Sequence, residues 1–112
     1  MLPKQRIGET LWHLITVFGM EQMTDLLKLS ERELRDVPGG RRELSPADAE
    51  RIIELAFIYD SISFVFAEKA AMSWLLGSNS YLDGARPLDA VWRGATAEAY
   101  AAVQVARAGG FA

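Results

Sequence analysis

Cysteine is absent from this chain of 112 residues, and histidine occurs only once, as His13. Without cysteine the chain forms neither disulfide bonds nor thiolate nucleophiles, which is compatible with the reducing cytosol. With one histidine and no cysteine, no nucleophile–base–orienter set can be assembled, apart from schemes built on carboxylates or lysine. Side chains at metal-ligand spacing are missing too. We therefore expect no enzyme activity, no metal site and no cofactor of the chain's own.

Long apolar runs are also missing. The longest, Leu55 to Ala67, is interrupted by Asp60 and is shorter than the roughly 20 residues that span a bilayer. The first residues, MLPKQRIGE, lack the apolar stretch of a signal peptide. We therefore expect a soluble, cytoplasmic protein with no membrane partner.

Basic residues are not in excess, and the net charge is −3. The first 45 residues hold equal numbers of basic and acidic side chains, so the negative excess lies in the remainder. Residues 28–42 are a modest basic spot, in which Lys28, Arg32, Arg35, Arg41 and Arg42 outnumber Glu31, Glu33 and Asp36. An acidic protein can still bind DNA through one such patch.

Alternation of apolar and polar residues with period two is absent, so the expected fold class is all-α. Apolar residues at helical spacing predict a first helix from Ile7 to Phe18, ended by Gly19, and a second over Met20–Leu29. Ser30-Glu31-Arg32-Glu33 has the form of a capping box, which predicts the start of a third helix. Pro38-Gly39-Gly40 ends it. Two short helices joined by a tight turn behind a first helix are typical of a helix-turn-helix.

A long central helix is expected next. Ser45-Pro46-Ala47-Asp48 combines an N-cap, a first-turn proline and an early acid, three signals of a helix start. From there, apolar residues continue to Val65 on more than one stripe, which predicts a helix buried on both sides. The loop Gly39–Leu44 is the only plausible internal boundary. We therefore expect a helix-turn-helix region over residues 1–44 and a second region over residues 45–112.

The last third of the chain predicts further helices. Arg86-Pro87 opens a short one, because proline fits the first turn of a helix, and Gly109-Gly110 suits the end of the last one. That last helix, from Thr96 to Ala108, has few polar residues, namely Glu98, Gln104 and Arg107. A lone surface helix shows a wider polar face. We therefore expect it to be covered on more than one side, in part by a partner.

Four motifs follow one another in this second region: Arg51-Ile52-Ile53-Glu54-Leu55-Ala56, Trp74 in its helix, Arg86-Pro87-Leu88-Asp89, and the ending Gly109-Gly110-Phe111-Ala112. In their order and spacing they resemble the toxin-binding domain of the Xre/MbcA/ParS antitoxin family, and MbcA-type members most. The resemblance runs from about Ser45 to the end of the chain. The last helix departs from the pattern, since it is rich in alanine where family members usually carry larger aliphatic side chains.

The resemblance implies an antitoxin of a type II toxin–antitoxin system, with an Xre-like helix-turn-helix, a long central helix and a small helical toxin-binding subdomain. Family members bind a toxin encoded alongside, often a RES-type toxin that degrades NAD, and block its active site with their C-terminal segment. Carried onto this sequence, the toxin-binding residues are Tyr100, Gln104, Arg107, Gly109, Gly110, Phe111 and Ala112, with Phe111 as the anchor. Any NAD belongs to the toxin.

The basic spot leaves two interpretations open. As a DNA reader, the chain would place Arg32 and Arg35 of the third helix in the major groove, where arginine bonds guanine, while Arg41 and Arg42 would hold phosphates. Alternatively, the helices are a retained scaffold whose acidic residues repel DNA. The first interpretation implies an antitoxin that represses its own operon. The alternative from another class is a helix-turn-helix transcriptional regulator without a toxin, whose C-terminal helices serve dimerisation.

Half of the residues are hydrophobic, which in so short a chain leaves apolar surface for an interface. We therefore expect a homodimer, through the central helix or the Trp12 region, within a higher-order toxin–antitoxin complex. Trp74 and Trp92 are expected to fill the C-terminal subdomain instead. Phe111 has little chain left to pack it, so we expect it to enter a partner's cleft, the alternative being a tail that folds back on its own domain.

Overall fold

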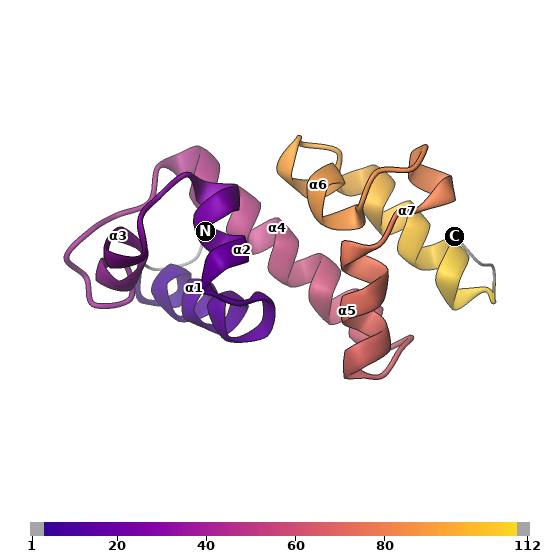
Figure 1. Ribbon diagram of the computed structural model, residues 1–112, viewed down its shortest axis with the longest axis horizontal. Coiled ribbons are helices and arrows are strands. Elements are labelled where there is room, and N and C mark those ends of the chain that lie inside the picture. Colours follow the sequence, from indigo (N-terminus) through magenta and orange to yellow (C-terminus); the bar gives the residue numbers. More distant parts are fainter. Residues whose placement is uncertain (1–3, 110–112) are drawn as a thin grey trace. The chain divides into compact units, whose positions relative to one another are not determined.

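The computed structural model describes residues 4–109, and every regular element in that range is helical (Figure 1). The all-α prediction is therefore confirmed. The chain divides into two compact units, Met1–Ile53 and Glu54–Ala112. Helix α4 (Pro46–Ser63) is shared, since its residues 46–53 belong to the first unit and 54–63 to the second. The functional division into residues 1–44 and 45–112 stays a prediction.

The first unit contains α1 (Lys4–Phe18), α2 (Met20–Leu27) and α3 (Glu31–Asp36), with α2 in contact with both α1 and α3. In the apolar stripe of α1, Leu11, Leu14 and Ile15 are buried and Ile7 and Phe18 are half-buried, whereas Trp12 and His13 are exposed. The fully buried large side chains of this unit are Leu11, Leu14, Met23, Leu34 and Ile52. The helix-turn-helix assignment itself stays a prediction.

Local signals set the ends of these helices. Gly19 separates α1 from α2 with a φ of 93°, a left-handed conformation that glycine adopts at little cost. The capping box is confirmed: the Ser30 hydroxyl accepts from the Glu33 N–H (3.1 Å), and the Glu33 carboxylate accepts from the Ser30 N–H (2.9 Å). These bonds to Ser30 lower the pKa of Glu33. Lys28 adopts a left-handed φ of 58° and ends α2 at Leu27, two residues before the predicted end.

The second unit contains residues 54–63 of α4, then α5 (Glu68–Leu76), the short 3₁₀ helix η1 (Ser80–Leu82), α6 (Pro87–Trp92) and α7 (Thr96–Arg107). Helix α6 packs on α5 and α7, and η1 packs on α7. Its fully buried large side chains are Leu55, Ile58, Ile62, Leu75, Leu88, Val91 and Val103. Trp74 and Trp92 are half-buried.

The expectation that the central helix is buried on both sides is wrong. One stripe of α4 in the second unit is fully buried, through Leu55, Ile58 and Ile62. Phe57, on the same helix, is 50% exposed, and Phe64, just beyond its end, is 86% exposed. The helix therefore presents apolar surface that the described residues do not cover.

Candidate partner-binding surface

Helix α7 has one buried stripe, made of small residues. Ala99, Ala102 and Val103 are fully buried and Ala106 nearly so. These side chains recur every three or four residues, so they lie on one face of the helix. Helices with small side chains at the contact approach closely, which explains the alanine content of α7 through its packing on α6. The other face of α7 is exposed or half-buried, so within the described chain only this one stripe is fully covered.

Three predicted toxin-binding residues, Tyr100, Gln104 and Arg107, lie on that other face, spaced four and three residues apart. Tyr100 and Arg107 are exposed, and Gln104 is half-buried. In the part of the chain that the structure describes, none of their side-chain polar groups has a hydrogen bond or an ion pair.

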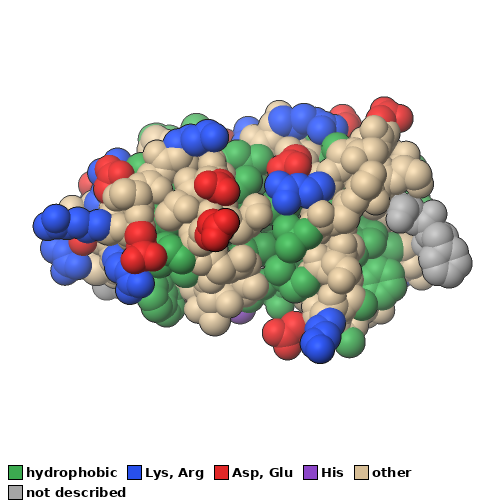
Figure 2. All heavy atoms as spheres, in the orientation of Figure 1, with side chains coloured by type: hydrophobic (Ala, Val, Ile, Leu, Met, Phe, Trp, Pro, Cys, Tyr) green, Lys and Arg blue, Asp and Glu red, His purple; other side chains and the backbone are tan. Residues whose placement is uncertain are grey.

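An aromatic pair extends this face. The rings of Phe57 on α4 and Tyr100 on α7 have centroids 5.2 Å apart and planes inclined by 34°, a favourable tilted geometry. Both stay exposed, Phe57 by 50% and Tyr100 by 36%. Figure 2 shows hydrophobic side chains at the surface in the part of the second unit that holds α5 and α7. The two rings therefore form a small apolar area on the surface of the second unit.

Gly109 is the one residue of the ending Gly109-Gly110-Phe111-Ala112 that lies within the described range. Its φ is 88°, and its N–H donates to the Ala106 carbonyl oxygen (3.0 Å), so it ends α7 in the way the sequence predicts. The predicted contacts of Gly110, Phe111 and Ala112 fall outside the described residues.

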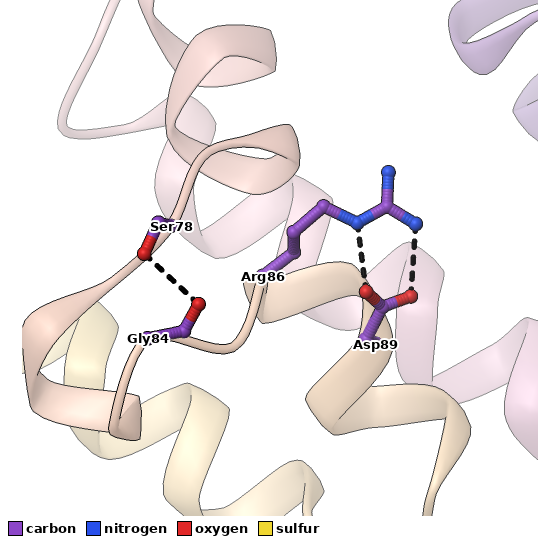
Figure 3. A network of polar contacts seen from close by, with 4 residues as sticks. All are labelled: Ser78, Gly84, Arg86 and Asp89. Carbon is purple, nitrogen blue, oxygen red and sulfur yellow. Dashed lines mark hydrogen bonds and ion pairs between the residues drawn. The ribbon is translucent and has the colours of Figure 1, made fainter.

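The motif Arg86-Pro87-Leu88-Asp89 starts α6 with an ion pair that sequence analysis did not identify. Pro87 occupies the first turn as predicted. Arg86 donates twice to Asp89, Nε to Oδ2 (2.7 Å) and Nη2 to Oδ1 (2.9 Å), as Figure 3 shows. This two-bond geometry is the strong form of an arginine–carboxylate contact. In the preceding loop, the Ser78 hydroxyl donates to the Gly84 carbonyl oxygen (2.9 Å).

The Arg86–Asp89 pair predicts a pH-dependent stability. The hydrogen bond from Arg86 lowers the pKa of Asp89 from its ordinary value of 3.8, so the pair's stabilisation is present above that value and is lost as the pH falls through the lower, folded-state pKa. Since Arg86 is 35% and Asp89 47% exposed, we expect less than about 1 kcal/mol. Asp89→Asn should lower the thermal midpoint at pH 7, and the difference should vanish at strongly acidic pH. Asp60→Asn, at an exposed position of α4, is the control, and an Asp89→Asn effect that persists unchanged in acid would contradict this origin.

The four predicted DNA-binding arginines are all exposed in the first unit. Three of them pair with acidic residues of α3: Arg35 with Glu31 (3.6 Å), Arg41 with Asp36 (3.0 Å) and Arg42 with Glu33 (2.8 Å). Arg32 has no such partner among the described residues. Phosphates would therefore have to displace carboxylates at three of the four positions.

Two kinds of site are missing from residues 4–109. No group of histidine and acidic side chains there could hold a metal ion. No helix in the same range has the length and apolar character needed to cross a membrane.

Comparison with known proteins gives one informative match. No protein-family model matches the sequence, and no curated protein sequence matches it. The structure is similar to a chain of the crystal structure of the M. tuberculosis MbcT–MbcA toxin–antitoxin complex, with a TM-score of 0.73 and 24% sequence identity. The match covers 94% of this chain and 96% of that one. The chain therefore has the fold of a protein from that toxin–antitoxin complex, which agrees with the resemblance seen in its sequence.

Proposed function

We propose that this chain is an antitoxin, which binds a toxin protein encoded alongside it and neutralises that toxin. The observation that carries the proposal is the likeness in fold, over 94% of the chain, to a chain from a toxin–antitoxin complex. The outer face of α7 supports it, because Tyr100, Gln104 and Arg107 keep their polar groups free of partners in the described chain. The resemblance in the sequence further implies a RES-type toxin that degrades NAD.

The proposed mechanism is occupation of the toxin's active site by residues 107–112, with Phe111 as the anchor. The left-handed Gly109 supports it, because it ends α7 and lets the following residues leave the helical path. Burying one phenylalanine side chain contributes roughly 1.5–3 kcal/mol, about ten- to a hundred-fold in affinity. Full neutralisation therefore needs the α7 face as well, where Tyr100 and Arg107 are residue types that dominate interfaces.

Co-expression with the adjacent reading frame tests the proposal. Expression of that frame alone should arrest growth and deplete cellular NAD, and expression together with this chain should restore both. Arrest without NAD loss would keep the antitoxin role and reject the RES-type toxin. A toxic neighbour that this chain neither binds nor neutralises would reject the antitoxin role itself.

A second activity is proposed for the first unit: a homodimer that binds operator DNA and represses its own operon. The observation in its favour is that α2 and α3 are joined by a short turn and that four exposed arginines lie on or after α3. If the chain neutralises a toxin but does not bind operator DNA, the first unit serves only as a structural scaffold. If DNA binding occurs without any toxin, the chain is instead a transcriptional regulator.

Replacement of Arg32, Arg35, Arg41 and Arg42 by alanine should weaken promoter binding by about a hundred-fold or more, since each good arginine–base pairing contributes roughly 1–3 kcal/mol. The slope of log affinity against log salt should also fall by about 0.9 for each phosphate that the variant no longer neutralises. Fluorescence anisotropy at several salt concentrations measures both. Arg93→Ala, an exposed arginine of the second unit, is the control. Unchanged affinity and slope would show that these residues do not bind DNA.

A further inference from the structure

Phe57 is an aromatic residue of α4 whose side chain stays half exposed to solvent. Its neighbours Leu55 and Ile58 are fully buried, whereas Phe57 is 50% exposed. Its ring lies beside that of Tyr100 on α7, with the centroids 5.2 Å apart. The exposed half of the ring gains nothing from folding, because only buried apolar surface contributes to the hydrophobic effect, and the buried stripe of α4 is complete without it. The packing of the described residues therefore does not account for the solvent-exposed half of Phe57.

The same face of α7 also carries a positive charge, on Arg107. Arg107 is exposed and lies on the same face of α7 as Tyr100, two turns further along. It has no carboxylate partner in the described chain, whereas three arginines of the first unit are each held by an acid. A complementary surface would therefore present an apolar pocket to the rings and a carboxylate to Arg107.

The exposed area of the aromatic pair is too small to form a stable interface by itself. With aromatic side chains of about 200 Å² each, the exposed parts of Phe57 and Tyr100 amount to about 170 Å². A standard interface buries about 800 Å² on each partner, so two copies held together through this pair alone would not be stable. The same area added to an interface that already includes α7 and the chain end is a useful anchor.

We infer that Phe57 belongs to the toxin-binding surface, where its ring and that of Tyr100 enter an apolar pocket of the toxin that is flanked by a carboxylate facing Arg107. This inference rests on the antitoxin function proposed above. It adds a residue of α4 that the sequence motifs do not include, and it places part of the interface outside the chain end. Removing Phe57 should therefore weaken the complex even when residues 107–112 are intact.

The test is the affinity of the purified full-length chain for the protein encoded in the adjacent reading frame, measured by titration calorimetry. Phe57→Ser should weaken binding about ten-fold or more, as expected for an aromatic residue at an interface. Phe64→Ser is the matched control, because Phe64 is an exposed phenylalanine of the same unit, at 86%, and, unlike Phe57, has no ring contact with Tyr100. Thermal unfolding checks that both variants are folded. If Phe57→Ser is not, Phe57→Leu and Phe64→Leu are compared instead, with a loss of about three-fold expected for the first alone.

The unaltered chain is titrated first, so that the antitoxin proposal is judged separately. No binding by the unaltered chain would reject the antitoxin function and this inference with it. Binding by the unaltered chain with equal affinities for the Phe57 and Phe64 variants would keep the function and overturn the inference. A Phe57 variant that changes the mass of the isolated chain from dimer to monomer, with toxin affinity intact, would assign the surface to a second copy and also overturn it.

Discussion

Deletion of residues 109–112 should abolish neutralisation of the proposed toxin and leave the stability of the protein almost unchanged. The last buried residue of α7 is Ala106, and Arg107, Ala108 and Gly109 are all exposed. Truncation after Ala108 therefore removes no described residue that contributes to the core. It does remove the whole segment that the proposed mechanism places in the toxin's active site. The loss of function should be complete at any expression level at which the intact chain restores growth.

Growth rescue in the co-expression assay measures neutralisation, and thermal unfolding of the purified truncated chain measures stability. Phe111→Ala provides a graded comparison, since removing one anchoring ring should weaken binding about ten- to a hundred-fold and leave partial rescue at high dose. A truncated chain that rescues growth at the same dose as the intact one would reject occupation of the active site. A truncated chain that melts far below the intact one would instead assign these residues to the domain's own stability.

Much of the fold could be predicted because its signals are local. The Ser30–Glu33 capping box needs only four consecutive residues, and it forms as predicted. Pro46 and Pro87 lie in the first turns of α4 and α6, as the missing N–H of proline requires. Helix ends without such a signal are less predictable: α2 ends at Leu27, two residues before the predicted end at Leu29. Where a cap or a proline is present, local chemistry sets the helix start, whereas an unmarked end depends on its neighbours.

The candidate site was harder to predict, because exposure depends on packing between distant segments. Phe57 and Ile58 are adjacent and both apolar, yet one is half exposed and the other fully buried. The periodicity of the sequence places Phe57 and Ile58 on the same helix. It does not show which side of that helix the later helices α5 to α7 leave exposed. The low polarity of α7 suggests that a partner protein covers the helix. The burial of its alanines on one side, however, is explained by close packing within the second unit. The outer face of the same helix, with Tyr100, is what remains for a partner.

The loop that leads into α6 depends on one buried polar side chain, Asn79, which is 1% exposed. Its Oδ1 accepts from the Tyr81 N–H (3.0 Å), and its own N–H donates to the Ala85 carbonyl oxygen (3.1 Å). Its carbonyl oxygen accepts from the N–H groups of Leu82 (3.0 Å) and Gly84 (2.9 Å). Since η1 packs on α7, these bonds also help to position the helix that carries the proposed toxin-binding face. The Nδ2 group, by contrast, has no hydrogen-bond partner within the described chain.

Asn79→Asp should therefore destabilise the protein in a pH-dependent way. The carboxylate can still accept from the Tyr81 N–H, and a charge-assisted bond of this kind contributes about 1.5–3 kcal/mol. Burying the ion costs several kcal/mol, which exceeds the contribution of this hydrogen bond. Burial therefore raises the pKa of the introduced carboxyl above its unfolded value of about 3.9. The variant should approach the unaltered chain in stability below that pH and fall behind as the pH rises through the folded-state pKa. At pH 7 we expect a deficit of about 2–4 kcal/mol, which lowers the thermal midpoint by roughly 10 °C.

Thermal unfolding between pH 4 and pH 8 checks this expectation. Asn79→Ser is the matched control, because it also loses the amide but introduces no charge, so its deficit should be nearly independent of pH. An Asn79→Asp deficit that stays constant across that range would mean that water reaches the carboxylate and that position 79 is not sealed in solution. Because η1 contacts α7, the same variant should also bind the toxin more weakly at pH 8 than at pH 5, relative to the unaltered chain. If the stability of the variant depends on pH but its affinity for the toxin does not, the loop supports the fold without positioning the binding face.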